Sequence, residues 1–501
     1  MLILNGSVMV PGGDPHAPRR LDLRIEGNLI VEVAETGTLH PAPGVAVIDA
    51  GGKLVVPGFV NAHHHSYDML AKGLLEDMPF DVWALHAQPA YFGPRSRAEL
   101  RVRTLLGALE NLKCGVTTLQ DFCSLVPQDD ETIDTILGAY REIGIRTAFS
   151  IAVRDVAALD IAPFVPTGAP PGVLELIQGA PGRARDELDY VERQIARLRP
   201  LPPRLSWILS PAGPQRASFE LLAGLGDLSA RLRIPVISHV YETKAQTAKA
   251  RQAYPEHGGS LIRRMQGAGL FAHRAFLAHM IWLLPDEIEL LAELGGGVIH
   301  NPLANLKLKN GIAPLRRLRE AGVPIALGCD NSSCSDAQNI FQAMKMLCLL
   351  AAGIDPEPTG LLAVNAFAAA TTGGARALGL EEQVGKIAPG MQADLALLDL
   401  SNIAYLPMNS AVRQMIYSDT GSSVDTVIVA GEVVLQHGVS TKIDEAALRA
   451  ELADIMGRFR ADFDAVAGRN RAAIPYLLEA NRRVQEMDVG AWRYLCQCRR
   501  E

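Results

Sequence analysis

The sequence predicts an α/β fold, namely a (β/α)8 barrel of the TIM type with a small β-sandwich domain built from both chain ends. Two observations carry this prediction. In the middle of the chain, apolar β-type runs alternate with amphipathic helical segments, in a number and size that fit eight strand–helix units. At each end, short runs of alternating polar and apolar residues are separated by Gly and Pro, which is typical of strands joined by turns.

These patterns also predict the division of the chain. Residues 1–57 are expected to supply the first part of the sandwich, with strands in LILNGSVMV, LDLRIEGNLIVEV and VAVIDAGGKLVV. Residues 58–385 are expected to form the barrel, with strands that include GVTTLQDF, IRTAFSIAV, LSWILSP and IPVISHV. Residues 386–440 resume the sandwich with DLALLDL and VDTVIVAGEVVLQHG, and residues 441–501 form a charged helical extension for packing or assembly.

Bulk composition narrows the class of protein. The chain has 501 residues, of which 48% are hydrophobic and 21% charged, as is ordinary for a soluble globular enzyme. The net charge of −7 and the lack of a basic run argue against binding to nucleic acid. MLILNGSVMVPGG is expected to be a strand and not a signal peptide, and MKMLCLLAAG is too short to span a membrane. Seven cysteines without a pairing pattern favour reduced thiols and a cytoplasmic protein.

Ligand-type side chains stand where the predicted barrel strands end. LVVPGFVNA leads into His63–His65, IPVIS into His239, AFLA into His279 and VPIALGC into Asp330. One such histidine would most often be an ordinary buried side chain. Because a barrel carries its active site at the carboxyl ends of its strands, four such coincidences in strand order favour a functional site.

The alternation of side chains along a strand places the three consecutive histidines on two different faces. Successive side chains point to opposite faces of a strand, so His63 and His65 are expected to point into the barrel mouth and His64 toward the helices. Two imidazoles at positions i and i+2 can bind one metal ion, with His239 as a third neutral ligand and Asp330 as an anionic fourth. We expect His64 to be structural.

At this point the sequence resembles a known family. The segments PGFVNAHHH, SHVYETKAQ, LAHMIWLLPDE, IHNPLANLKLKNGIAP and ALGCDNSSCSD are similar to motifs of the amidohydrolase superfamily. Within it they resemble the mononuclear-metal branch of cytosine, guanine and S-adenosylhomocysteine deaminases and of atrazine chlorohydrolase. GKIAPGMQADLALLDL and VDTVIVAGEVV resemble the C-terminal β-domain of that branch. The resemblance extends over residues 1–440 and is more specific for the metal site than for the substrate.

The resemblance implies roles for individual residues. His63 and His65 match the first-strand metal pair of the family, and His239 matches its third metal histidine. His279 matches the histidine that hydrogen-bonds the metal-bound water or the substrate, and Asp330 matches the aspartate that holds the metal and takes a proton from the water. A binuclear member would need a lysine on a middle strand, and LSWILSP has none.

Glu242 follows His239 in HVYET, at the HxxE spacing of the branch. There it can protonate a ring nitrogen of the substrate, a step that typically contributes about 10²–10⁴-fold to the rate. The alternative is a carboxylate that only orients a metal-binding histidine. We expect the catalytic role.

The expected cofactor is one divalent metal ion per subunit, zinc or iron(II), which lowers the pKa of bound water from 15.7 toward about 7. The favoured function is a deaminase that replaces an exocyclic amine of a purine, pyrimidine, pterin or triazine by hydroxyl. One alternative keeps the site but hydrolyses a chloro or N-alkylamino group of a triazine-like ring. Another is a metal-free, non-catalytic scaffold, which the presence of all five ligand-type residues disfavours.

Substrate contacts are expected in loops at the strand ends. Phe80 and Trp83 in AKGLLEDMPFDVWALH either stack on a flat ring or pack a helix onto the barrel rim. Gln215 and Arg216 in SPAGPQRAS follow a strand end and could reach the substrate.

Three further residues are weighed in the same way. Asn305 either orients a ligand or fixes its loop, and Asn331 and Cys334 lie next to Asp330 in sequence, where they could tune the choice of leaving group. Segment 155–185 is rich in Pro and Gly and is either a lid or a plain exposed loop.

The expected partners are a small heterocyclic substrate and further copies of the chain in a homo-oligomer.

Overall fold

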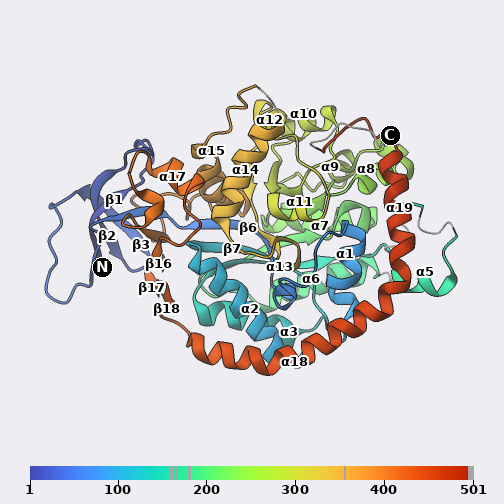
Figure 1. Cartoon of the computed structure of the whole chain (residues 1–501), viewed down its shortest axis with the longest axis horizontal. Helices are drawn as coiled ribbons and strands as arrows, with labels where there is room; N and C mark the ends of the chain where they lie inside the picture. The colour runs from blue at the N-terminus through green and yellow to red at the C-terminus, as the bar shows by residue number, and fades with distance from the viewer. Residues whose placement is uncertain (158–162, 165–167, 179–181, 355–356, 495–501) are drawn as a thin grey trace.

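The computed structural model describes residues 1–157, 163–164, 168–178, 182–354 and 357–494 (Figure 1). Its centre is a parallel sheet with the order β13-β12-β11-β10-β9-β8-β7-β6-β14. The strands are β6 (Phe59–His65), β7 (Val116–Cys123), β8 (Arg146–Val153), β9 (Leu205–Pro211), β10 (Val236–Val240), β11 (Ala275–His279), β12 (Gly297–His300), β13 (Ile325–Leu327) and β14 (Asp330–Asn331). The apolar runs that the sequence analysis quotes as barrel strands are therefore all strands.

The last predicted strand is split, and the split closes the barrel. β13 pairs with β12, whereas β14, two residues further on, pairs with β6. Between them, the amide of Gly328 donates to the carbonyl of His300 and the amide of Cys329 donates to the carbonyl of His63, both at 3.1 Å. One chain segment thus joins the last strand position to the first, and the prediction of a (β/α)8 barrel is confirmed.

Helices surround this sheet on its outer side (Figure 1). Several begin at a side-chain cap, which satisfies amides of the first turn: Ser96 accepts from Glu99 N at 3.2 Å, and Asp129 accepts from Thr132 N at 2.8 Å. The main outer helices are α2 (Arg97–Lys113), α3 (Asp130–Ile143), α6 (Ala184–Arg197), α7 (Phe219–Leu232), α9 (Leu261–Gly267), α10 (Pro285–Glu293), α12 (Leu315–Glu320), α14 (Ile340–Ile354), α15 (Ala363–Ala368) and α16 (Gly374–Ala377).

Shorter helices follow the carboxyl ends of the barrel strands. They are the 3-10 helices η1 (Ser66–Ala71), η2 (Pro89–Tyr91) and η3 (Pro214–Arg216) and the α-helices α1 (Phe80–Ala87), α5 (Pro171–Gln178), α8 (Lys244–Ala253), α11 (Pro302–Lys307) and α13 (Ser332–Ser335). Among all described helices, none combines the length and the apolarity needed to cross a membrane.

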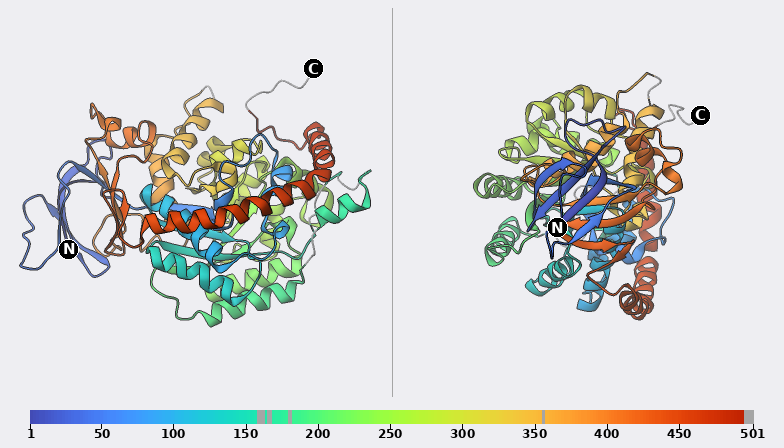
Figure 2. Two further views of the ribbon diagram at one scale, coloured as in Figure 1. Left: turned by 60° about the horizontal axis from the view of Figure 1, so that its bottom comes forward. Right: turned by 90° about the vertical axis from the view of Figure 1, so that its left-hand side faces the viewer.

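A second sheet of nine strands is built from both chain ends, as the sequence predicts. Its order is β18-β17-β16-β15-β5-β1-β2-β3, with β4 paired to β1. The sheet is mixed and continuous, and it curls around its own core of Ile3, Leu23, Ile30, Leu395 and Ile428 (Figure 2). Its strands are β1 (Leu2–Val8), β2 (Arg19–Glu26), β3 (Leu29–Glu35), β4 (Val47–Asp49), β5 (Lys53–Pro57), β15 (Leu395–Asp399), β16 (Val424–Val429), β17 (Glu432–Gln436) and β18 (Val439–Ser440), with the 3-10 helix η6 (Ile403–Tyr405) and α17 (Ala411–Tyr417) between β15 and β16.

The end of the described chain is helical, and it wraps the barrel. α18 (Glu445–Asn470) runs along α1 and α2, and α19 (Ile474–Glu486) then turns across α1 and α8 (Figures 1 and 2). Phe459 and Phe463 of α18 join the apolar cluster around Trp83. Leu477 and Ala480 of α19 pack in one cluster with residues of α1 and α5. The extension is therefore part of the structure at the carboxyl ends of the barrel strands.

Candidate metal centre and substrate cavity

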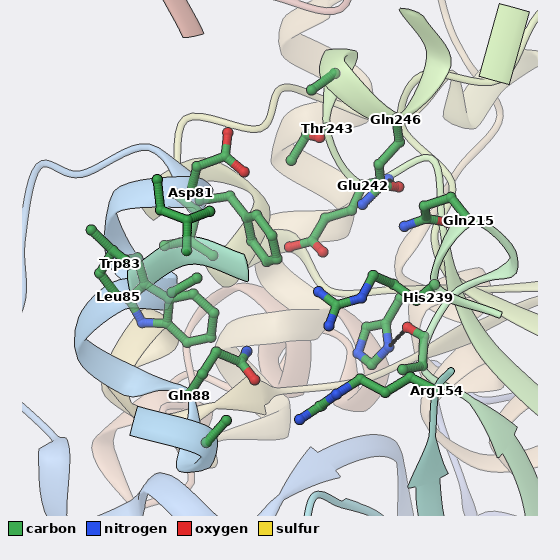
Figure 3. Close-up of a pocket in the computed structure, with 18 of the residues that line it drawn as sticks. Asp81, Trp83, Leu85, Gln88, Arg154, Gln215, His239, Glu242, Thr243 and Gln246 are labelled. Carbon is green, nitrogen blue, oxygen red and sulfur yellow. Dashed lines mark hydrogen bonds between the residues drawn. The ribbon is translucent and has the colours of Figure 1, made fainter. Parts of the chain in front are cut away.

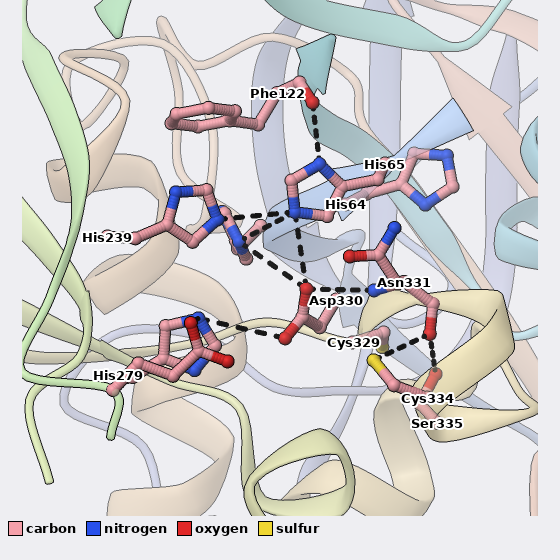
Figure 4. Close-up of polar contacts among 12 residues, drawn as sticks. His64, His65, Phe122, His239, His279, Cys329, Asp330, Asn331, Cys334 and Ser335 are labelled. Atoms are coloured by element: carbon pink, nitrogen blue, oxygen red, sulfur yellow. Dashed lines mark hydrogen bonds and ion pairs between the residues drawn. The ribbon is translucent and has the colours of Figure 1, made fainter. Parts of the chain in front are cut away.

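The four expected metal ligands converge at the strand ends (Figure 4). The Nε2 atom of His65 lies 3.1 Å from Nε2 of His63 and 3.4 Å from Nε2 of His239. Oδ1 of Asp330 lies 3.2 Å from Nε2 of His65 and 3.6 Å from Nε2 of His63. β6, β10 and β14 thus bring residues from opposite ends of the barrel sequence to one point.

Backbone carbonyls fix the orientation of two of these imidazoles. Nδ1 of His65 donates to the carbonyl of Phe122 at 2.6 Å, and Nδ1 of His239 donates to the carbonyl of Ala212 at 3.1 Å. A neutral imidazole that donates from Nδ1 carries its lone pair on Nε2. The lone pairs of His65 and His239 therefore face one another, an arrangement that a cation between them stabilises.

The spacing of the cluster fits a metal ion. Four ligands held at about 2.1 Å around a tetrahedral Zn²⁺ stand roughly 3.4 Å from one another. The nitrogen and oxygen atoms of His63, His65, His239 and Asp330 have separations of 3.1–3.6 Å where they approach. Donor atoms of two overlapping triads, His63–His239–His279 and His63–His65–Asp330, each lie within 4.8 Å of one another. Three imidazoles and one carboxylate are also the donor types that zinc and iron(II) accept.

His279 stands beside the cluster. Its Nδ1 lies 2.8 Å from Oδ1 of Asn305, and its Nε2 lies 3.8 Å from both Oε2 of Glu242 and Oδ2 of Asp330. His279 and Asp330 have φ angles of +73° and +62°, in the left-handed region. Such backbone strain at a strand end is held only where the surroundings determine it, and it redirects both side chains toward the cluster.

Burial sets the protonation of the site. It lowers the pKa of His63 and of His239 well below the usual range, and the neighbouring histidines add to this effect. Burial, together with the charge of Asp330, raises the pKa of Glu242 well above the usual range, although Nδ2 of Asn310 donates to Oε1 of Glu242 at 3.0 Å. Both effects favour the uncharged forms: a neutral imidazole, as a metal ligand must be, and a protonated Glu242 carboxyl group, which can act as a proton donor.

His64 points away from the cluster, as strand alternation predicts (Figure 4). Its Nδ1 lies 2.8 Å from Oε1 of Gln338, whose amide nitrogen in turn donates to the carbonyl of Asp330 at 2.8 Å. His64 therefore supports the last barrel segment from the helical side, which is a structural contact.

A cavity of about 630 Å³ opens above the cluster (Figure 3). This volume is within the usual range for sites that take small organic ligands. Its floor consists of cluster and neighbouring residues, and the walls come from α1, α5, α19 and the turns after β8 and β9. The floor residues are His65, His239, Glu242, His279 and Asp330.

The expected substrate-contact residues divide into two groups. Phe80, Trp83, Gln215 and Asn331 line the cavity, whereas Asn305 and Cys334 do not stand among its lining residues. Trp83 is only 2% exposed and its indole donates to Oγ of Ser333 at 2.8 Å, so it also packs α1 onto the barrel.

Asn305 and Cys334 contact other residues of the site and not the cavity, which indicates supporting roles. Asn305 holds His279 through the hydrogen bond described above. Burial raises the pKa of the Cys334 thiol well above its usual range, and this thiol donates to the carbonyl of Asn331 at 3.3 Å. Such a thiol is not a nucleophile, and it supports the turn that follows Asp330.

Several residues that line the cavity were not identified from the sequence. Arg154 directly follows β8, so the strand-end rule that found the histidines could also have found it. Tyr91 of η2 carries no such signal. The α19 residues Leu477, Ala480, Asn481 and Val484 also line the cavity, and they belong to a helix that the sequence places far from the barrel strands.

Segment 155–185 contributes one wall, although the question of a lid falls partly on residues 158–162, 165–167 and 179–181, which lie outside the described residues. Within the described part, Glu175, Leu176 and Ile177 of α5 line the cavity. Arg483 of α19 stacks over the ring of Phe164, with its guanidinium carbon 4.3 Å from the ring centre. This segment therefore packs against the C-terminal extension over the cavity.

Several known proteins are similar to this chain along most of its length. A 5-methylthioadenosine/S-adenosylhomocysteine deaminase of Pyrococcus furiosus is 30% identical over 455 residues, covering 89% of this chain and 97% of the relative. A 5'-deoxyadenosine deaminase of Methanothermobacter thermautotrophicus is 30% identical over 452 residues, covering 88% and 96%. The crystal structure of an adenosine deaminase from Xanthomonas campestris with bound zinc is 28% identical, with a TM-score of 0.79 over 92% of this chain and 98% of that chain.

An atrazine chlorohydrolase of Arthrobacter aurescens, also complexed with zinc, shares the fold at 22% identity with a TM-score of 0.78, over 91% of this chain and 99% of that chain. The amidohydrolase family model matches residues 54–434, from the last strand of the N-terminal segment through the barrel to β17. The closed barrel, the histidine–aspartate cluster at its strand ends and this match agree, and the chain belongs to the amidohydrolase family.

Proposed function

We propose that this protein is a metal-dependent deaminase that replaces the exocyclic amine of an adenine-type ring by hydroxyl. The observation that carries the proposal is the cluster of His63, His65, His239 and Asp330 with Glu242 beside it, on the floor of a cavity of about 630 Å³. The relatives support the ring class, since the two that are 30% identical to this chain are named as deaminases of adenine nucleosides.

In this proposal one ion per subunit is held by the four ligand residues. Zinc is favoured over iron(II), because the adenosine deaminase structure that is 28% identical carries zinc. When bound, a divalent ion acidifies a water molecule, so that hydroxide is available at neutral pH. The neutral state of His63 and His239, whose pKa values burial lowers, suits them to bind the ion without first losing a proton.

The side chains around the cluster divide the proton transfers. Glu242 gives its proton to a ring nitrogen, which makes the neighbouring ring carbon more electrophilic. Asp330 takes a proton from the attacking water and passes it to the leaving amine, and His279 hydrogen-bonds the attacking oxygen. A carbon–oxygen bond forms and the exocyclic carbon–nitrogen bond breaks, so that one water is consumed and one ammonia is released.

The test is ammonia release by purified protein of known metal content. The panel contains adenosine, 5'-methylthioadenosine and S-adenosylhomocysteine, with cytosine, guanine, a pterin and melamine as other ring classes. We expect ammonia from the adenine compounds. If ammonia comes only from another ring, the ring class is wrong. If one equivalent of metal is bound and only chloride or an alkylamine is released, from a chlorinated or alkylated triazine, the deaminase proposal fails.

We also infer a homo-oligomeric, cytoplasmic protein. The segment from η6 to the start of α17 exposes Ile403, Leu406 and Met408, whose exposed fractions are 80%, 56% and 44%. Apolar side chains that gather on a surface mark protein contacts. The five cysteines in the described part of the chain are free thiols, which supports a reducing environment. Light scattering measures the oligomeric state directly, and a monomer at working concentration would contradict the first inference.

A further inference from the structure

The side chain of Glu242 reaches the cavity floor against the alternation of its strand. His239 of β10 lines the cavity. If the strand continued regularly, Tyr241 would point the same way as His239, and Glu242 would point outward. Instead Tyr241 is buried in the apolar core, and Glu242 lines the cavity beside His239 (Figure 3). A local change of the backbone therefore brings the expected proton donor to the floor of the cavity.

This change occurs at Tyr241. Its φ angle is +53°, in the left-handed region, which a residue with a bulky side chain adopts only where its surroundings hold it. Its carbonyl accepts from the amides of Ile281 and Trp282, both at 3.0 Å, in the turn after β11. The turn after β10 is thus joined to the turn after β11 at the residue that changes the direction of the side chains.

The phenol of Tyr241 is anchored between α9 and α10. Its hydroxyl donates to Oε1 of Glu287 at 2.5 Å and accepts from the amide of Leu261 at 2.8 Å. The hydroxyl of Ser260 donates to the same oxygen of Glu287, and the amide of Leu284 donates to its Oε2 at 2.8 Å. Tyr241 and Glu287 are each 1% exposed. The phenol therefore contacts the first turns of both helices.

Glu287 is a buried carboxylate whose three donors are neutral groups. Removing such a charge from water costs free energy that neutral donors return only in part. Leu284 precedes α10, so the contact of its amide with Oε2 caps that helix. Capping leaves Oε1 for Tyr241 and Ser260, and the contact with Tyr241 connects Glu287 to the turn that carries Glu242.

The turn after β11 also fixes the carboxyl group of Glu242. The indole of Trp282 donates to the carbonyl of Asn310 at 2.6 Å, and Nδ2 of Asn310 donates to Oε1 of Glu242 at 3.0 Å. The amide of Glu242 donates to Oε1 of Gln246 at 2.8 Å. Because the amide of Trp282 donates to the carbonyl of Tyr241, one turn holds both the backbone before Glu242 and the end of its side chain.

We propose that Tyr241 and Glu287 are positioning residues: Glu287 holds Tyr241 in its left-handed conformation, and this conformation directs the carboxyl group of Glu242 to the substrate ring. The inference rests on the proposed function, because it takes Glu242 as the proton donor to the ring. Proton transfer requires the donor to be placed within a fraction of an ångström. Loss of the Tyr241–Glu287 contact should therefore lower kcat and leave metal content and KM nearly unchanged.

The main test compares two buried tyrosines that lose the same kind of hydrogen bond. Tyr241→Phe removes the donor to Glu287, and Tyr405→Phe removes a donor to Oδ2 of Asp419, 2.9 Å away in the segment between β15 and β16. With the panel compound that releases ammonia fastest, Tyr241→Phe should lower kcat about 10–100-fold at full metal content. Tyr405→Phe should keep the kcat of the wild type. An unchanged kcat in Tyr241→Phe, or a loss of metal that parallels the loss of activity, would overturn the proposal.

Variants of Glu287 assign the effect to one contact. Glu287→Gln keeps an oxygen for the hydroxyl of Tyr241 and should retain most of kcat, whereas Glu287→Leu should lower kcat as far as Tyr241→Phe does. In the double variant Tyr241→Phe/Glu287→Leu the two losses should not add, because both break the same hydrogen bond. Additive losses would contradict the proposal. If Glu287→Leu does not fold, Tyr241→Phe and Glu287→Gln still decide the question.

A ring-independent measurement separates this inference from the proposed function. Hydrogen–deuterium exchange with mass spectrometry reports on the amides of the turn after β11, where Ile281 and Trp282 donate to Tyr241, and on the amide of Glu242. Exchange in both turns should be faster in Tyr241→Phe and unchanged in Tyr405→Phe. If the panel yields no ammonia but exchange rises, the ring class fails and the hold on Tyr241 stands. If ammonia is released and neither kcat nor exchange changes in Tyr241→Phe, the positioning role fails and the deaminase stands.

Discussion

The floor and the roof of the cavity are built in different ways. The floor residues His65, His239, His279 and Asp330 sit on barrel strands or directly at their ends, and hydrogen bonds to backbone or to buried amides hold them. The roof consists of cavity-lining residues of α1, α5 and α19, which meet through apolar contacts between segments far apart in sequence. The floor lies within the region that matches the family, whereas α19 lies beyond residue 434.

This difference separates the residues expected to carry out the reaction, on the floor, from those expected to select the substrate, at the roof. A rigid strand end positions a reacting group within a fraction of an ångström, as bond making requires. A roof of packed helices can change its lining while the floor stays the same. We therefore expect floor variants to change metal binding or kcat, and roof variants to change KM and stability.

The largest effect is expected for His239→Ala. This variant removes one of three imidazoles and leaves Nε2 of His65 facing one partner fewer. Metal content, measured by atomic emission, should fall from one equivalent to near zero, and activity should fall with it. His437→Ala is the control, because this exposed histidine lies in the turn between β17 and β18, outside the barrel. Near-stoichiometric metal in His239→Ala would remove His239 from the ligand set.

Glu242→Gln should keep the metal and lose turnover by about 10²–10⁴-fold, because the amide cannot give up a proton to the ring. The measurement is kcat at known metal content. Glu175→Gln is the matched control, since Glu175 is an exposed carboxylate of α5 that lines the same cavity. Full activity in Glu242→Gln would show that another group protonates the ring.

Asn305→Ala should lower kcat/KM by about 10–100-fold, because His279 loses the acceptor that fixes its ring. Asn305→Asp keeps an oxygen at the same place and should recover most of the activity. If both variants behave like the wild type, the orientation of His279 does not depend on this contact. Hydrogen bonds to buried amides would then not be what holds this floor residue in place.

At the roof, Leu477→Ala should act mainly on stability and KM. Leu477 is 5% exposed in the cluster that joins α1, α5 and α19. Truncation should cost about 2 kcal/mol of unfolding free energy and raise KM a few-fold with little change in kcat. Leu478→Ala, at a neighbouring position that is 47% exposed, should leave both unchanged. A large loss of kcat in Leu477→Ala would mean that the roof takes part in positioning for the reaction.

The smallest effect is expected for Asp81→Asn. Burial raises the pKa of Asp81 to about 6, so the folded state holds this proton more tightly than the unfolded chain, whose aspartate has a pKa of about 3.9. The charged group therefore destabilises the fold as pH rises through this interval. Asp81→Asn should match the wild type near pH 4 and gain about 1 kcal/mol above pH 6, a figure reduced for partial exposure. Thermal denaturation at the two pH values measures the difference, and an equal gain at both would contradict it.

Much of the floor could be predicted from the sequence. Strand alternation alone assigned His63 and His65 to one face and His64 to the other, and the strand-end rule placed His239, His279 and Asp330 at the same edge of the sheet. These inferences succeed because a strand has a fixed period and a barrel has a fixed polarity. A position along the chain then becomes a position in space.

The roof, the joint placement of Arg154 and Arg216 at the cavity, and the closure of the barrel could not be predicted in the same way. The split of the last strand into β13 and β14 depends on hydrogen bonds from Gly328 and Cys329 to two different strands. The amphipathic pattern of α19 predicts that one of its faces is buried, but it does not identify the element that covers this face. The contact of α19 with α1 and α5 consists of many weak apolar contacts between segments that are distant in sequence.

The sequence by itself thus determined the fold class, the strands and the ligand-type residues of the floor, because each follows from a local period. Only the tertiary structure decided that Arg154 and Arg216 stand on neighbouring turns and that Leu477 of α19 lines the same cavity. These residues meet through packing between separate turns and helices, which no local pattern encodes.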